Sequence, residues 1–128
     1  MNINLVSFNP LSADIAGNAA RVADILRAPA PKGDLIILPE AALCGCPLFD
    51  LFDDKRLLAQ NAAALKELAK ETKETALVLG YMDRQDGASV TAAAYIYKGK
   101  ITKIFDSETI SFKGQNIQFV LGSPEEAV

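Results

Sequence analysis

The order in which strand and helix patterns alternate constrains this chain more than any other feature. Residues 35–38 are an uninterrupted aliphatic run, Leu-Ile-Ile-Leu, which is typical of a strand buried on both faces of its sheet. A shorter apolar run lies at 3–8, and between the two runs residues 14–28 place apolar side chains at helical spacing. Strand, helix and strand in this order predict two parallel strands joined by a crossover helix.

The second part of the chain repeats the alternation once and then changes to hairpins. A helix is expected from a cap at Asp53 or Asp54 to about residue 73, with its buried stripe on Leu58, Ala62, Leu65, Leu68 and Ala69. Further strands are expected at 76–81, 90–97, 101–105, 109–112 and 116–121, and turns that contain glycine are expected at 85–88, 98–99 and 113–115. We therefore predict an α/β fold with layers of helix and sheet, in a single domain spanning residues 1–128.

The residue types exclude several classes of function. The chain has no histidine, so serine–histidine and cysteine–histidine nucleophiles are excluded. Its net charge of −3 argues against a nucleic-acid partner, which requires a basic surface. No segment approaches the roughly 20 apolar residues that cross a bilayer, so no membrane partner is expected. The N-terminus lacks the basic region of a secretory signal, and we expect a cytoplasmic protein.

The cysteines are Cys44 and Cys46. They are too close together for an easy disulfide and too few for a structural zinc site, which takes four nitrogen or sulfur ligands. We expect no metal and no cofactor. Because no basic residue is expected beside them, packing as small buried side chains is favoured over a reactive thiol.

Leu38-Pro39-Glu40 is the segment that best resembles a site. In open α/β sheets, ligands bind at the carboxyl ends of the strands, and a proline there stops the hydrogen-bond ladder. A partly desolvated glutamate at this place is suited to act as a general base. The alternative is a solvated loop glutamate after a core strand, and one carboxylate by itself does not exclude it.

Three other features have structural interpretations. Tyr95 and Tyr97 alternate along a predicted strand and are expected to pack on its face. Lys113 occupies a predicted turn and is expected to be solvated. Ser123 is an unsuitable nucleophile, because the chain has no histidine to activate it.

A resemblance to a known family rests on motifs in the first third of the chain. They are Asn9-Pro10, Gly17-Asn18, Leu38-Pro39-Glu40 and Gly45-Cys46-Pro47. With them the chain resembles the opening of a nitrilase (carbon–nitrogen hydrolase) superfamily domain. More narrowly, it is similar over residues 3–106 to the N-terminal glutaminase domain of glutamine-dependent NAD⁺ synthetases.

The resemblance implies a nitrilase-like layered sandwich, truncated to about the first half of the αββα domain. It implies that Glu40 is the general base, beside a lysine and a nucleophilic cysteine, with glutamine or a small amide as ligand. This sequence departs from the pattern at both partners: the lysine position holds Ser107 and the cysteine position holds Gly122. The family's Gly-Tyr-Pro tyrosine is Cys46 here, and the loop between lysine and cysteine is deleted.

Three functions remain open from the sequence. The first is a domain of an NAD⁺ synthetase-like protein that resembles its glutamine amidotransferase part but is catalytically inactive. The second is a free-standing binding or assembly protein, and the third is a residual amidase that uses Glu40. In a truncated sandwich, we expect an uncovered apolar sheet face at Leu5, Ile37 and Val78. This predicts a homo-oligomer that packs sheet on sheet, or association with a synthetase domain.

Overall fold

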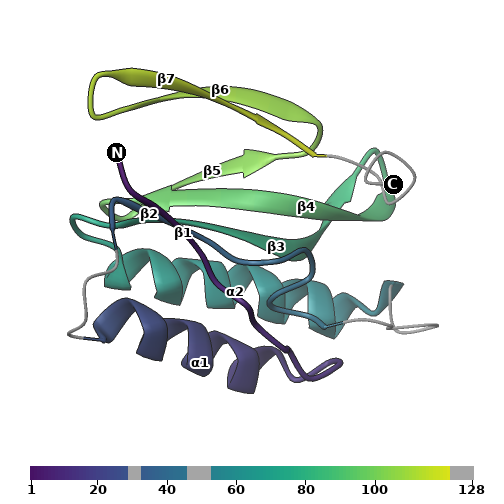
Figure 1. Cartoon of the computed structure of the whole chain (residues 1–128). Helices are drawn as coiled ribbons and strands as arrows, with labels where there is room; N and C mark the ends of the chain where they lie inside the picture. Colours follow the sequence, from purple (N-terminus) through teal and green to yellow (C-terminus); the bar gives the residue numbers. More distant parts are fainter. Residues whose placement is uncertain (29–32, 46–52, 122–128) are drawn as a thin grey trace.

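Helices and strands follow one another in the order that the sequence predicts. The computed structural model describes residues 1–28, 33–45 and 53–121 (Figure 1). Within these ranges the elements are β1 (Ile3–Leu5), α1 (Ile15–Arg27), β2 (Leu35–Ile37), α2 (Lys55–Glu71), β3 (Ala76–Gln85), β4 (Ala88–Tyr97), β5 (Lys100–Ile104), β6 (Ser107–Phe112) and β7 (Gln115–Val120). The predicted α/β class is confirmed.

The described strands form one mixed sheet and one separate hairpin. The mixed sheet has the strand order β1-β2-β3-β4-β5, in which β1, β2 and β3 are parallel and β3, β4 and β5 are antiparallel. Strands β6 and β7 pair with each other as a two-stranded antiparallel sheet. Helices α1 and α2 cover one side of the mixed sheet, and the β6–β7 hairpin lies over the other (Figure 1).

Both helices begin at aspartates that cap them. The Asp14 carboxylate accepts a hydrogen bond from the Gly17 backbone N–H at 3.1 Å. Asp54 accepts from the backbone N–H groups of Arg56 and Leu57, at 2.8 and 3.2 Å. These bonds satisfy N–H groups that the first helical turn leaves unpaired, so the predicted start of the second helix is confirmed at Asp54.

The buried stripe of α2 differs from the predicted one at its first turns. Ala62 is exposed, whereas Leu57 and Asn61 are buried. Asn61 can be buried because its side chain donates to the Leu57 carbonyl at 2.8 Å and accepts from the Met82 backbone N–H at 3.0 Å. A hydrophobic pattern does not reveal a polar residue that is buried by such bonds.

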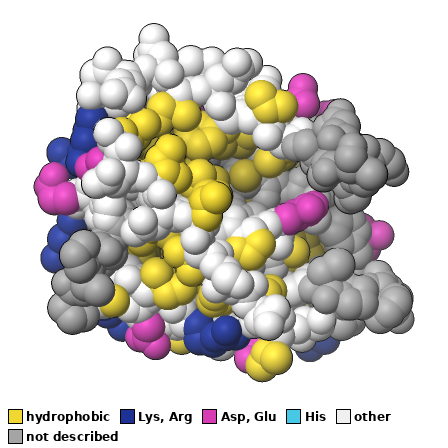
Figure 2. Space-filling model, viewed as in Figure 1, with side chains coloured by type: hydrophobic (Ala, Val, Ile, Leu, Met, Phe, Trp, Pro, Cys, Tyr) yellow, Lys and Arg dark blue, Asp and Glu magenta, His cyan; other side chains and the backbone are white. Residues whose placement is uncertain are grey.

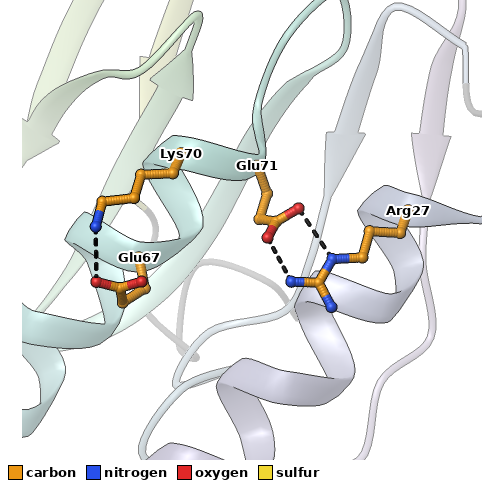
Figure 3. Close-up of polar contacts among 4 residues, drawn as sticks. All are labelled: Arg27, Glu67, Lys70 and Glu71. Carbon is orange, nitrogen blue, oxygen red and sulfur yellow. Dashed lines mark hydrogen bonds and ion pairs between the residues drawn. The ribbon is translucent and has the colours of Figure 1, made fainter.

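The two helices are joined at their C-terminal ends by an ion pair. Arg27 on α1 donates through two guanidinium nitrogens to both carboxylate oxygens of Glu71 on α2 (Figure 3). Glu67 and Lys70 form a second pair within α2, at 3.1 Å. Because these side chains lie at the surface, we assign the pairs a minor share of stability, and the helices are held mainly by their apolar contact with the sheet.

Three tight turns of the same kind connect the antiparallel strands. They are centred on Asp86-Gly87, Lys98-Gly99 and Lys113-Gly114, and both central residues of each turn have positive φ, between 48° and 81°. Positive φ at both positions is the property of type I′ turns, whose twist matches that of the flanking strands. The sequence predicted each of these turns from its glycine.

The β6–β7 hairpin builds a second core on the side of the sheet opposite the helices. Phe112 packs edge-on against Tyr97 and Tyr95, with ring centroids 4.9 and 6.4 Å apart, and Phe119 lies 5.9 Å from Tyr95. The expected packing role of both tyrosines is confirmed. Burial raises the pKa of Tyr95, whose hydroxyl has no hydrogen-bond partner among the described residues.

The expectation of an uncovered sheet face is only partly correct. Val78 is buried under the hairpin, and Ile37 is half-buried, so for Val78 the prediction is wrong. Leu5 on the edge strand β1 is 79% exposed, as expected. The prediction failed at Val78 because it did not anticipate that β6 and β7 fold back over the sheet.

The tip of the hairpin is anchored to the start of β2. The ammonium group of Lys113 lies 2.6 Å from a carboxylate oxygen of Asp34, whose other oxygen accepts from the Asn2 backbone N–H at 2.9 Å. These hydrogen bonds, first that of Lys113, lower the pKa of Asp34. Lys113 is exposed, as expected for a lysine in a turn, and it also pairs with Asp34, which the sequence did not predict. In the described parts of the chain, no helix is long and apolar enough to cross a membrane.

Candidate functional site

Glu40 follows the inner parallel strand β2. The chain leaves the strand at Leu38, whose N–H still donates to the Val78 carbonyl at 2.8 Å, and Pro39 comes next. The Glu40 side chain is exposed, and one of its oxygens accepts from the Thr91 hydroxyl on β4 at 3.3 Å. The expected position at the strand end is confirmed, and of the two alternatives that the sequence left open the exposed side chain agrees with a solvated loop glutamate.

Glu40 stands at the rim of a cleft between the mixed sheet and β7. The cleft has a volume of about 480 Å³, which falls within the usual size of small-molecule sites. Its described lining is mostly apolar and includes Ile37, Val78, Ala93, Ile104, Phe119 and Leu121. Figure 2, in the same view as Figure 1, shows hydrophobic side chains gathered on this face of the molecule.

Gly80 on β3 allows the Glu40 loop to pack directly against the sheet. A Cβ at this position would meet the Ala41 nitrogen and would lie 2.8 Å from Glu40 Cα. Ala41 itself has a φ of 57°, which is unfavourable for a residue with a side chain. The position of Glu40 is therefore set by a close backbone contact and a strained neighbour, not by its own side chain.

Asn18 holds the loop after Glu40 from the helix side. This side chain is fully buried in α1 and exchanges two hydrogen bonds with the backbone of Leu11, at 2.8 and 2.9 Å. It also donates to the Leu43 carbonyl at 2.8 Å. One amide thus ties the loop after β1 to the loop after β2, which explains why Gly17-Asn18 belongs to the motif pattern in the sequence.

The residue at the predicted lysine position lies near the end of β7. Ser107 is exposed, begins β6 and pairs with Val120, and it is not among the described residues that line the cleft. The Leu121 N–H donates to the Asp106 carbonyl at 2.8 Å and fixes the end of the hairpin there. Gly122 and Ser123 follow immediately in the sequence and lie outside the described residues.

The cysteines do not supply a replacement nucleophile in the described structure. Cys44 is 1% exposed and packs in the core between helices and sheet, which confirms its structural interpretation. Cys46 lies outside the described residues. Over the described ranges, no group of three or more acidic, cysteine or histidine side chains is placed to hold a metal ion.

Thr91 and Gly80 are site residues that the sequence did not reveal. Thr91 belongs to an antiparallel strand far from Glu40 in the sequence, and only the register of β3 and β4 brings it close. Glycine within a strand can mark a close approach of another backbone, and that signal was present at Gly80.

The fold and the position of the Glu40 carboxylate together define the class of protein. The chain is an α/β domain whose candidate site lies at the carboxyl ends of parallel strands. Comparison with protein families then gives the family: the carbon–nitrogen hydrolase model matches residues 2–110, and the chain belongs to this family, within the nitrilase superfamily. None of the curated proteins matches the chain closely enough to count as a relative.

Solved structures support the same fold. The glutamine-dependent NAD⁺ synthetase from Acinetobacter baumannii superposes with a TM-score of 0.80 at 21% identity, over 91% of this chain and 26% of the synthetase. The corresponding synthetase from Cytophaga hutchinsonii gives 0.73 at 16% identity, over 91% and 24%. A mutant amidase from Nesterenkonia sp. AN1 in complex with butyramide gives 0.75 at 16% identity, over 91% and 53%.

This chain corresponds to only part of each of these three proteins. It spans about a quarter of the two synthetases and about half of the amidase. The predicted resemblance to the NAD⁺ synthetase glutaminase domain is confirmed, and the mixed sheet matches part of the nitrilase fold.

Proposed function

We propose that this chain is a catalytically inactive carbon–nitrogen hydrolase domain that retains a small-molecule cleft at Glu40. The observation that carries the proposal is the chemistry of the cleft lining. Among the described residues that line it, Glu40 is the titratable side chain, and there is no thiol and no amine. Hydrolysis of an amide by a covalent route needs a nucleophile, and stabilisation of the developing charge needs a donor such as lysine.

The sequence supports the same conclusion at the two aligned positions. Ser107 stands at the lysine position and Gly122 at the cysteine position, so both partners of Glu40 are replaced. A serine hydroxyl carries no positive charge, and glycine has no side chain that can attack a carbonyl. The role that remains for the cleft is the binding of a small molecule, and the resemblance by itself, without the charge of this cleft, implies glutamine or a small amide.

The broader role that we propose is that of a glutaminase-like part associated with NAD⁺ synthesis. It rests on the resemblance to the two NAD⁺ synthetases, whose structures match 91% of this chain. In this role the domain contacts a synthetase domain without supplying ammonia from glutamine.

An ammonia-release assay tests the absence of catalysis. We expect no ammonia above the uncatalysed background when the chain is incubated with glutamine or with butyramide. Release that disappears in Glu40→Gln would show a residual amidase and overturn the proposal. Binding is followed in parallel by NMR titration with butyramide, with Thr91 and Ala93 as reporters of the cleft.

A second candidate function, assembly, is favoured by the edge strand β1. Ile3 is in register with Leu35, and since neighbours in register share a face, Ile3 and Leu5 point to the hairpin side of the sheet. They are 47% and 79% exposed, because the hairpin does not cover this edge. An edge strand with exposed apolar side chains is a site for contact with a second copy of the chain.

Light scattering coupled to size-exclusion chromatography tests the assembly proposal. We expect a dimer at micromolar concentration and a shift to monomer in Leu5→Glu. A matched control is Leu11→Glu, which adds the same charge at an exposed leucine outside the strands. A monomeric wild-type chain would refute self-association.

A further inference from the structure

The charges of the residues that line the Glu40 cleft favour a cationic ligand. Fourteen described residues line the cleft, and none of them is a lysine or an arginine. Glu40 is the charged member of this lining, and Thr91 adds a hydroxyl. We infer that the cleft takes an apolar primary amine in its protonated form. The inference rests on the proposed function, in which the cleft binds a small molecule.

The carboxylate of Glu40 is not neutralised within the described structure. Its hydrogen bond is to the neutral hydroxyl of Thr91, at 3.3 Å, and it takes part in no ion pair among the described residues. Two lysines on the neighbouring strands and turns are committed elsewhere. Lys103 pairs with Asp83 at 3.2 Å and Lys113 with Asp34 at 2.6 Å.

An ammonium group suits this carboxylate better than an amide does. It carries three N–H donors and a positive charge, and hydrogen bonds between charged partners are roughly twice as strong as neutral ones. A carboxylate ligand would be repelled by Glu40. Of the three segments whose structure is not described, 46–52 and 122–128 contain no lysine or arginine, and 29–32 contains Lys32.

The remainder of the cleft defines the other end of the ligand. Val78, Ala93 and Ile104 belong to the sheet side of the lining, and Phe119 and Leu121 to the hairpin side. The cleft volume of about 480 Å³ accommodates an aliphatic chain of several carbons. Burial of each methylene group adds roughly 0.8 kcal/mol to binding, which corresponds to about a fourfold gain in affinity per methylene.

A matched series of three six-carbon probes separates the head groups. Hexylamine, hexanamide and hexanoate share one chain and present a cation, a neutral amide and an anion. We expect hexylamine to bind about tenfold more tightly than hexanamide, and hexanoate to bind most weakly, in NMR titrations of the whole chain. The advantage of the amine should decrease when salt is raised, because screening weakens exposed charge pairs.

Two variants assign the preference to Glu40. In Glu40→Gln we expect hexylamine to lose its advantage while hexanamide binding changes by less than about twofold. Glu108→Gln removes an exposed carboxylate on β6 that does not line the cleft, and it should leave the preference unchanged. Circular dichroism of both variants confirms that they are folded before the titrations.

The possible results distinguish this inference from the proposed function. If hexanamide binds and hexylamine binds no better, or if the amine preference survives in Glu40→Gln, the amine inference is wrong and the binding cleft stands. If none of the three probes shifts the resonances of Thr91 and Ala93, both the cleft as a binding site and its amine preference are refuted.

Discussion

Replacing Gly80 by alanine is the most direct test of how Glu40 is positioned. The added Cβ would lie 2.8 Å from Glu40 Cα and 2.9 Å from Glu40 C, and would also meet the Ala41 nitrogen. All three are backbone atoms, so no side chain can rotate away. Relief requires the loop to move, and overpacking of this kind costs about 1–3 kcal/mol.

The close contact reverses the sign of the change in the free energy of unfolding that Gly→Ala would otherwise cause. In a strand without such a contact, Gly→Ala stabilises by about 0.5–1 kcal/mol because glycine loses more conformational entropy on folding. With the contact, we expect the free energy of unfolding to fall by about 1–3 kcal/mol. For a chain of this size the melting temperature should drop by roughly 4–12 °C.

Thermal and urea unfolding followed by circular dichroism measure the loss, and NMR shifts of Ala41 and Thr91 report the displacement of the loop. Gly114→Ala is the matched control, since its Cβ would have nothing within 4 Å but its φ is +78°. The control should lose stability through backbone strain without moving the Glu40 loop. A Gly80→Ala variant that is as stable as the wild type, with unchanged shifts, would refute the close approach.

Four further substitutions test side-chain contacts in the loops and in the hairpin core. Asn18→Ala should cost about 1–3 kcal/mol in urea unfolding, because it removes the partner of the buried Leu43 carbonyl and of the part-buried Leu11 N–H and carbonyl, and a loss under about 0.5 kcal/mol would contradict the role of this amide. The lowered pKa of Asp34 means that its contribution to stability is present above the pKa of an unfolded aspartate and is lost as pH falls through the lower folded value. Asp34→Asn and Lys113→Gln should each therefore reduce the decrease in the free energy of unfolding between about pH 5 and pH 2. If the pH dependence of unfolding is unchanged in both variants, the contact between Asp34 and Lys113 does not stabilise the fold. Tyr95→Phe should leave stability within about 0.5 kcal/mol or raise it, since the buried hydroxyl has no partner among the described residues, and a larger loss would reveal a hydrogen bond there.

Much of the site could be inferred from local sequence. The aliphatic run before Pro39 predicted a buried strand, and the rule for parallel strands predicted that Glu40 would lie at its carboxyl end. The register confirms this, with Leu35 between Ile3 and Ala76 in the parallel part of the sheet. These predictions succeeded because both features are visible in neighbouring residues. A strand buried on both faces is a continuous aliphatic run, and a proline follows where this strand ends.

The partners of Glu40 could not be inferred in the same way. Thr91 lies 51 residues from Glu40 in the sequence, and the two are joined by the pairing of β3 with β4. The exposure of Glu40 was left open between two alternatives, because the solvent contact of a loop carboxylate depends on how the surrounding elements pack. Such distances and exposures are properties of the assembled layers.

What the sequence by itself determined is the set of elements, their turns and the family. The cap at Asp54 and the glycine-containing turns act between residues a few positions apart, so the local sequence is sufficient to predict them. The tertiary structure decided where the β6–β7 hairpin lies. It buries Val78 and binds Asp34 through Lys113, 79 residues away, while Leu5 remains 79% exposed. These outcomes depend on contacts between distant segments, and hydrophobic patterning identifies buried faces without specifying which element will cover them.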